Sequence, residues 1–284
     1  MNLQQKTEES IGLIRRAERL ALKMNPAGFW LAFSGGKDSC VILELAKRAG
    51  VKFTAYYNVT TLDPPELVRF IIEQHPEVVR IHPPKTFFQL VREKGFLPTR
   101  LTRYCCAVLK ENQGAGYCQI TGVRKAESVR RANLWTEDTT IKHGNMFERK
   151  DFRKMEETEF QCVGGKDKVI LNPILKWTDA DVWNFIRQNK IPYCKLYDKG
   201  KYRLGCLFCP MSNYRERDRE LYPKYYRLLQ KAVQSIFDAD KNNYFENAQD
   251  MLDWWFSDQS ISEFLANKNQ LKIPFDYETG KNRV

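Results

Sequence analysis

Apolar residues recur along the first part of the chain either as short continuous runs or at helical spacing. The first 25 residues carry apolar positions three and four apart and end at Asn25-Pro26, which predicts an amphipathic helix. A continuous apolar run from Phe29 to Phe33 predicts a buried strand, and the pattern that follows, from about Asp38 to Arg48, is helical. The chain therefore begins with a helix, a strand and a second helix.

The alternation of strands and helices continues through the middle of the chain. Runs rich in β-branched, aromatic or other apolar residues predict further strands over about 51–60, 78–82, 117–123 and 169–173. Helical patterns lie between several of them, and two more, over 222–237 and 248–256, follow in the C-terminal part. Such alternation is typical of α/β proteins, and it predicts a doubly wound, mostly parallel sheet followed by a C-terminal helical cap.

Two helix starts have clear polar signals. Asp63 precedes two prolines, which predicts a helix with Asp63 as its N-cap and a proline in the first turn. Thr178 followed by Asp181 resembles a capping box at the start of another helix.

These patterns divide the chain into three parts. We expect residues 1–25 to form an N-terminal helix, 26–215 to form one α/β domain that contains both cysteine pairs, and 216–284 to form a helical extension. Within the domain, residues 136–159 are polar and weakly periodic, which predicts a mobile insertion or lid. Residues 164–167 repeat the letters Gly-Gly-Lys-Asp, but a strand pattern follows them, so we expect a hairpin turn there.

The segment Ser34-Gly35-Gly36-Lys37-Asp38-Ser39 lies between the first predicted strand and a predicted helix. Glycines let the backbone turn sharply and aim its N–H groups inward, and the helix adds its positive end. Two hydroxyls and a lysine add further donors, so the segment predicts a site for a phosphate chain. The alternative is an ordinary turn with Asp38 or Ser39 as N-cap.

The same segment lacks the spacing of two common nucleotide motifs. It has neither the four-residue spacer of the mononucleotide P-loop nor the G-x-G-x-x-G of dinucleotide folds. This disfavours a hydride-transfer enzyme and an ordinary phosphoryl-transfer ATPase.

A second candidate anion site follows the strand predicted over 117–123. Gly122 is followed by Arg124 and, further on, by Arg131, and guanidinium groups match phosphate or sulfate oxygens. The alternative is the basic surface of a helix.

The net charge of +11 suits a polyanionic partner such as a nucleotide, a nucleic acid or an acidic carrier protein, although a solvated basic surface would give the same excess. No apolar run is long enough to span a membrane, and the N-terminus does not resemble a secretory signal. We therefore expect no membrane partner and a cytoplasmic location.

Eight cysteines without an export signal indicate thiol or metal chemistry. Cys206 and Cys209 have the spacing of a chelating pair, and the adjacent Cys105 and Cys106 could complete four thiolate ligands for zinc or an iron–sulfur cluster. Unliganded buried cysteines and a redox-active pair are the alternatives. Of the other four, Cys40 and Cys118 lie in apolar patterns, which indicates a structural role.

Ser34 to Ser39 resembles the pyrophosphate-binding loop, or PP-loop, of the adenine-nucleotide α-hydrolase superfamily. From about residue 28 to 213 the chain further resembles the phosphoadenosine phosphosulfate reductase family, in segments that occur in the family's order: Gly122-Val123-Arg124, Glu127-Ser128, Asn172-Pro173-Ile174, Trp177-Thr178, Asp181-Val182-Trp183, Ile191-Pro192-Tyr193, Leu196 to Gly200, and the two cysteine pairs. The resemblance implies an adenine nucleotide, as Mg-ATP or a sulfonucleotide, bound at Ser34 to Ser39, Gly122 and Arg124. It also implies a 4Fe-4S cluster on Cys105, Cys106, Cys206 and Cys209, with zinc as the alternative.

One family feature is missing. Reductases of this family use a cysteine in a C-terminal Glu-Cys-Gly-Leu-His segment, and these 284 residues hold no cysteine after Cys209. We therefore favour an adenylating ATP pyrophosphatase or sulfurtransferase that acts on a nucleic-acid or other anionic acceptor. Lys37, Arg124 and Arg131 would neutralise phosphate charge, and Asp38 would assist Mg²⁺.

Two other functions stay open. The first is a sulfonucleotide reductase whose thiol comes from Cys194 or from a thiol protein, and the second is a non-catalytic subunit that senses nucleotide or redox state. A sulfur-donor protein and a homo-oligomer are further expected partners.

Overall fold

The computed structural model describes residues 1–127, 160–163, 168–242, 244–271, 275–276 and 281–282. The chain divides into two compact units, and each unit is built from two separate segments. Unit 1 contains Met1–Pro83 and Val108–Gly205, and unit 2 contains Pro84–Ala107 and Cys206–Val284. The segments that carry the four candidate cluster cysteines thus belong to unit 2, whereas the sequence analysis placed them in the nucleotide-binding domain.

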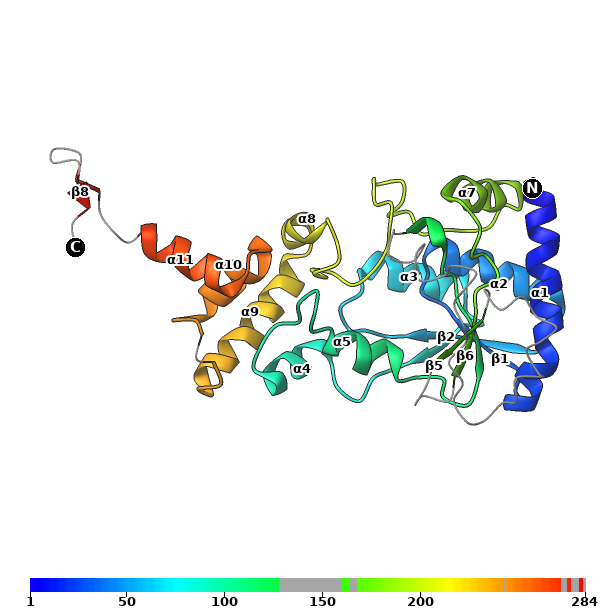
Figure 1. Ribbon diagram of the computed structural model, residues 1–284, viewed down its shortest axis with the longest axis horizontal. Coiled ribbons are helices and arrows are strands. Elements are labelled where there is room, and N and C mark those ends of the chain that lie inside the picture. The colour runs from blue at the N-terminus through cyan, green and yellow to red at the C-terminus, as the bar shows by residue number, and fades with distance from the viewer. Residues whose placement is uncertain (128–159, 164–167, 243, 272–274, 277–280, 283–284) are drawn as a thin grey trace. The chain divides into compact units, whose positions relative to one another are not determined.

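The centre of unit 1 is a six-stranded sheet with the order β3-β2-β1-β4-β6-β5 (Figure 1). The strands are β1 (Phe29–Ala32), β2 (Phe53–Asn58), β3 (Val79–Ile81), β4 (Cys118–Ile120), β5 (Phe160–Val163) and β6 (Lys168–Leu171). Five strands are parallel, and β5 pairs with β6 in the antiparallel direction. The predicted α/β fold with a mostly parallel sheet is confirmed.

One apolar core joins the sheet of unit 1 to its helices. Phe29 and Leu31 of β1 are fully buried in it, together with residues from α1 (Leu3–Met24), α2 (Lys37–Ala49), α3 (Pro65–Gln74) and α7 (Asp179–Gln188). Helix α2 packs against both α1 and α7. Because α2 begins directly after β1, this packing fixes the position of the loop that joins them.

The structure confirms the predicted N-cap of α7 and contradicts that of α3. The predicted capping box of α7 is present: the Thr178 side chain accepts a hydrogen bond from the backbone N–H of Asp181, and Asp181 accepts one from that of Thr178. The predicted N-cap of α3 is wrong, because Pro64 occupies that position. The Asp63 carboxylate is turned away from the helix and accepts hydrogen bonds from the Tyr57 hydroxyl at 2.5 Å and the Thr60 N–H at 3.0 Å.

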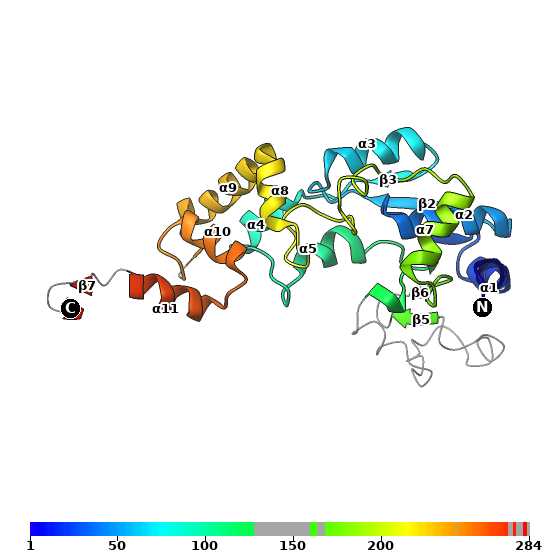
Figure 2. The same cartoon turned by 90° about the horizontal axis from the view of Figure 1, so that it is seen from above.

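Unit 2 is mainly helical. Its helices are α4 (Phe87–Lys94), α5 (Tyr104–Cys106), α8 (Arg215–Leu221), α9 (Pro223–Asp238), α10 (Ala248–Ser257) and α11 (Ile261–Leu271). A π-helical turn, Ala107–Glu111, follows α5 and belongs to unit 1 from Val108 onward. Two short antiparallel strands, β7 (Phe275–Asp276) and β8 (Lys281–Asn282), lie near the C-terminus. Helices α4, α8 and α10 all pack on α9, as Figure 2 shows for α8 and α10. The apolar stripe of α9, with Leu229, Val233 and Ile236 fully buried, explains this arrangement.

Some sequence predictions fall outside the described residues. These are the insertion over 136–159, the turn at 164–167 and Arg131. The strands on either side of 164–167, β5 and β6, are antiparallel neighbours, as a hairpin requires. Among the helices that the structure describes, none combines the length and the apolar character that a membrane crossing needs.

Candidate functional site

The loop between β1 and α2 has a backbone that only glycine fits well. Gly35 has a φ of +70°, and a Cβ atom there would lie 2.6 Å from Leu67 Cδ1 of α3. A side chain at this position would therefore be strained by its backbone and by its neighbour. Gly36, with a φ of −77°, is the N-cap of α2 and has no side chain to cover the helix N-terminus. The predicted turn into a helix start is present.

The two serines of the loop hold its shape. The Ser34 hydroxyl accepts a hydrogen bond from Gly36 N–H at 3.4 Å and donates one to Ser39 Oγ at 3.3 Å. Ser39 Oγ donates in turn to the Gly36 carbonyl oxygen at 2.8 Å. Ser34 is solvent-exposed and Ser39 is buried, so Ser34 is the hydroxyl that a ligand in solution would meet first.

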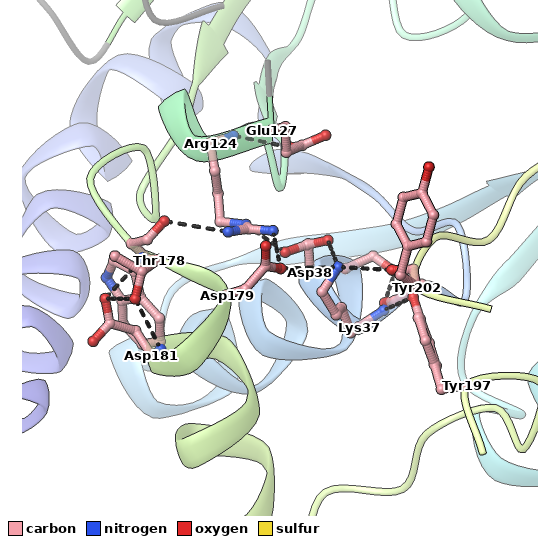
Figure 3. A network of polar contacts seen from close by, with 12 residues as sticks. Lys37, Asp38, Arg124, Glu127, Thr178, Asp179, Asp181, Tyr197 and Tyr202 are labelled. Atoms are coloured by element: carbon pink, nitrogen blue, oxygen red, sulfur yellow. Dashed lines mark hydrogen bonds and ion pairs between the residues drawn. The ribbon is translucent and has the colours of Figure 1, made fainter. Parts of the chain in front are cut away.

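Lys37, the first residue of α2, lies almost fully inside the protein with 6% of its surface exposed. Its Nζ is 3.4 Å from an oxygen of Asp38 and 3.4 Å from Asp179 Oδ1, and it donates to the Tyr202 carbonyl oxygen at 3.4 Å. Its backbone N–H donates to the Tyr197 hydroxyl at 2.8 Å. Figure 3 shows these contacts as one connected network that also includes Arg124.

Arg124 follows β4 and is 1% exposed. Its Nε is 2.6 Å from Asp38 Oδ1, its Nη2 is 2.9 Å from Asp179 Oδ1, and its Nη1 donates to the Trp177 carbonyl oxygen. Burial alone would lower the pKa of the Arg124 guanidinium, but the two carboxylates outweigh burial and raise it. The sequence analysis assigned this side chain to a phosphate ligand, and in the structure it binds two carboxylates and a carbonyl oxygen of the protein.

The two cations of the site change the pKa of Asp179. Burial would raise the pKa of Asp179, but the positive charges of Arg124 and Lys37 and their hydrogen bonds lower it. Asp179 is therefore a charged carboxylate at neutral pH, although 64% of its side chain is exposed.

Close packing explains why position 122 is a glycine. A Cβ atom at Gly122 would lie 3.1 Å from the carbonyl carbon and the Cβ of Asp38. Glycine thus allows the backbone after β4 to approach the first turn of α2. The structure brings together Ser34, Gly35, Gly36, Lys37, Asp38, Ser39, Gly122 and Arg124 from the predicted set.

Sequence reasoning missed three partners of Lys37. Tyr197 and Tyr202 come from the loop after α7, and Asp179 is its first residue. Asp179 looked like part of a helix start, and Tyr197 was noted only within the family resemblance. The available signal was that Tyr197 lies in a segment that resembles the family and that Asp179 lies between two such segments.

The four cysteines of the predicted cluster all lie in unit 2 and are half-buried. A hydrogen bond to Cys106 and burial raise the pKa of the Cys105 thiol, and the nearby Cys106, Cys206 and Cys209 raise it further. Among the residues that the structure describes, however, no three His, Cys, Asp or Glu side chains are arranged so that they could hold a metal ion.

The loop that carries Cys206 and Cys209 is anchored by the residue before the second cysteine. Phe208 is fully buried, has a φ of +56°, and contacts the rings of Tyr226 and Phe256. A bulky residue at positive φ is uncommon and must be held by its surroundings. Packing of Phe208 therefore fixes the backbone on which both sulfurs are placed.

The parallel sheet and the glycine turn before α2 define an α/β protein with a candidate phosphate site at the carboxyl end of β1. Residues 28–212 match the phosphoadenosine phosphosulfate reductase domain, which is more than half of the chain. The chain belongs to this family.

Two relatives illustrate what the chain is similar to in sequence. An uncharacterised protein of Methanocaldococcus jannaschii is 29% identical over 234 residues, which are 76% of this chain and 43% of the relative. The adenosine 5'-phosphosulfate reductase of Allochromatium vinosum is 26% identical over 194 residues, which are 63% of this chain and 66% of that enzyme. The chain thus spans less than half of the first relative and about two thirds of the second.

Among solved structures, the phosphoadenylyl-sulfate reductase of Candida auris in complex with phosphate is similar to this chain. The TM-score is 0.44 at 15% identity, and the match covers 72% of this chain and 93% of that one.

Proposed function

We propose that the chain is an adenine-nucleotide-binding enzyme of sulfur metabolism that binds Mg-ATP at Ser34 to Ser39 and adenylates an acceptor. The observation that carries the proposal is the position of Lys37 at the start of α2, directly after the Gly35 turn. A backbone turn, a helix N-terminus and a buried ammonium group together favour a phosphate chain at this place.

In the proposed reaction an acceptor oxygen attacks the α-phosphorus of ATP. A new bond forms between that oxygen and the α-phosphorus, the bond to the bridging oxygen of the β-phosphate breaks, and pyrophosphate leaves. Lys37 neutralises charge on the departing phosphates. Mg²⁺, which is part of the substrate, prefers carboxylate oxygens, and Asp38 offers one beside Lys37.

Arg124 has a different part in this proposal from Lys37. Since its guanidinium binds Asp38 and Asp179, it supports Asp38 from inside the protein. Arg131 would add a further positive charge for the phosphates, as the sequence analysis proposed.

The second candidate is reduction of a sulfonucleotide, which is favoured by the relatives named as adenosine 5'-phosphosulfate reductases. In that reaction a thiolate attacks the sulfur of the sulfonucleotide, AMP leaves, and a second thiol releases sulfite. Cys194 is a poor source of the thiolate, because it is 1% exposed and burial raises its pKa. This candidate therefore needs a thiol from another protein, such as thioredoxin.

We further propose that Cys105, Cys106, Cys206 and Cys209 hold a 4Fe-4S cluster, with zinc as the alternative. The chemistry of the donor set supports the proposal, because four thiolates are the usual ligands of such a cluster, although in the described residues no three of these side chains are yet arranged around a metal position. The cluster would supply a place to hold or pass sulfur. Such thiols persist in a reducing compartment, which favours the cytoplasm.

The chemical class of the acceptor is proposed from the net charge of the chain. The excess of +11 suits a nucleic acid or another polyanion, which the positive surface would attract.

The test uses anaerobically purified protein with Mg-ATP, adenylylsulfate and phosphoadenylylsulfate in separate reactions, each with a dithiol and with mixed RNA as acceptor. We expect pyrophosphate from ATP, measured by chromatography of the products. Lys37→Ala should abolish it, while Lys47→Ala, which alters an exposed lysine of the same helix, should not. Sulfite from a sulfonucleotide would instead establish the reductase, and nucleotide binding without any product would favour a sensing subunit.

A further inference from the structure

One oxygen of Asp179 faces both cations of the candidate site. Asp179 Oδ1 is 3.4 Å from Lys37 Nζ and 2.9 Å from Arg124 Nη2 (Figure 3). A single oxygen that contacts an ammonium and a guanidinium resembles, in charge and position, an oxygen of a bound phosphate.

The backbone donor at the same place is also occupied by the protein itself. The N–H of Lys37 is at the start of α2 and would point to a phosphate, but it donates to the Tyr197 hydroxyl at 2.8 Å. The ring of Tyr197 lies 5.8 Å from Lys37 Nζ. Two side chains, a carboxylate and a hydroxyl, therefore take the places of ligand oxygens around one lysine.

We propose that Asp179 is a specificity-determining residue: its carboxylate occupies the anion position beside Lys37 in the free protein, and the ligand's phosphate must replace it. The inference rests on the proposed function, since it concerns the same phosphate site.

Asp179 is able to leave without disturbing the fold. Its side chain is 64% exposed, whereas the start of α7 is held by the capping box of Thr178 and Asp181. The side chain can therefore rotate into water while the backbone stays in place. Arg124 keeps two partners after the exchange, Asp38 Oδ1 at 2.6 Å and the Trp177 carbonyl oxygen at 3.3 Å.

Asp38 is unsuited to the same role. Its side chain is only 22% exposed, and its two oxygens are divided between Arg124 at 2.6 Å and Lys37 at 3.4 Å. The ligand's phosphate therefore replaces Asp179, the more exposed of the two carboxylates, and Asp38 stays in place.

The exchange selects ligands by charge. A phosphate chain that carries several negative charges attracts Lys37 more strongly than one carboxylate does, but a nucleoside without phosphate offers nothing to replace Asp179. The chemical class that fits is a di- or polyphosphate group or the phosphosulfate group of a sulfonucleotide.

The test measures binding of inorganic pyrophosphate to the full chain by titration calorimetry. Asp179→Asn removes the competing charge, and we expect pyrophosphate to bind about fivefold more tightly, which corresponds to about 1 kcal/mol for one charge that is screened by water, as the 64% exposed Asp179 side chain is. Asp179→Glu keeps the charge and should bind as the wild type does. Glu44→Gln is the matched control, because it removes one carboxylate charge of α2 that pairs with Arg48 and has no part in the capping box that holds Asp179.

The signs of the results separate the alternatives. If Asp179 only positions the two cations, Asp179→Asn will bind pyrophosphate more weakly than the wild type or equally well, and the inference is wrong. In that case Lys37→Ala still abolishes binding, so the phosphate site itself stands. If Glu44→Gln tightens binding as much as Asp179→Asn does, the effect is one of general charge and the inference also fails. If the wild type and Lys37→Ala bind pyrophosphate equally, the phosphate site itself is wrong, and the proposed function falls together with this inference.

Discussion

Arg124 Nε lies 2.6 Å from Asp38 Oδ1, and this contact joins the turn after β4 to the second residue of α2. The two residues are far apart in the sequence, yet the side chain of Arg124 is 1% exposed and that of Asp38 is 22% exposed. The charged centre of the candidate site is thus built into the interior of unit 1, and its groups depend on one another.

The first prediction concerns this dependence. Arg124→Ala leaves Asp38 without its closest cation and empties a buried volume, so we expect the free energy of unfolding to fall by about 3 kcal/mol. Urea unfolding followed by circular dichroism measures the change. Arg48→Ala is the control: its exposed pair with Glu44 predicts a loss below about 1 kcal/mol. An equal loss in both variants would contradict a special role for Arg124.

The second prediction compares the two loop glycines. Gly35→Ala places a methyl group 2.6 Å from Leu67 Cδ1 at a φ of +70°, and we expect it to lower the free energy of unfolding by roughly 2 kcal/mol. Gly36→Ala meets its nearest atoms at 3.4 and 3.5 Å with an ordinary φ, so its cost should be clearly smaller. Thermal unfolding of the two variants checks the order, and a reversed order would show that the loop has another conformation.

The third prediction concerns acid. Burial would raise the pKa of Asp181, but hydrogen bonds from Lys6 and Thr178 outweigh it and lower the pKa below its ordinary value. The stabilisation by Asp181 is therefore complete above the unfolded-state pKa of about 3.9 and is lost as the pH falls through the lower, folded-state pKa. We expect the wild type to be more stable than Asp181→Asn at pH 6 and this difference to shrink toward about pH 2. Urea midpoints across that range measure it, and a constant difference would exclude the ionic contribution.

The fourth prediction concerns the proposed cluster. After anaerobic reconstitution with ferrous iron and sulfide we expect about four irons per chain and a broad visible absorption. Cys105→Ser or Cys209→Ser should lose most of this iron. Cys118→Ser is the matched control, because Cys118 is a fully buried thiol of β4 in unit 1.

Three results would oppose that prediction. Loss of iron in Cys118→Ser as well would indicate damage to the fold, and retention of iron in Cys105→Ser and Cys209→Ser would remove the assignment of these ligands. Zinc in the protein as purified, with no iron uptake, would establish the alternative metal.

The five parallel strands and the helices between them could be predicted from the sequence because apolar spacing reports local structure directly, but the antiparallel edge strand β5 was missed. The glycine turn before α2 and the capping box of Thr178 are equally local, since each is set by residues a few positions apart. The wrong N-cap at Asp63 shows the limit of such rules. Its carboxylate has stronger partners in Tyr57 and Thr60 than the helix N-terminus beyond Pro64 would give.

The contacts of Lys37 could not be predicted in this way. Tyr197 and Asp179 reach it only because α7 packs against α2, and nothing in the local pattern marks either side chain. The partners of Arg124 were missed for the same reason. Its arginine type and its place after a strand indicated an anion, but the carboxylates that it binds come from two other helices.

The division of unit 2 into two segments also affects how the protein is made. Cys105 and Cys106 leave the ribosome with the first segment, and Cys206 and Cys209 follow only after the remaining part of unit 1 has been synthesised. Because domains generally begin to fold as they emerge, the sheet of unit 1 can form before the second cysteine pair exists. Any metal centre on these four thiols would therefore be assembled late in biosynthesis, on a chain whose first unit is already folded.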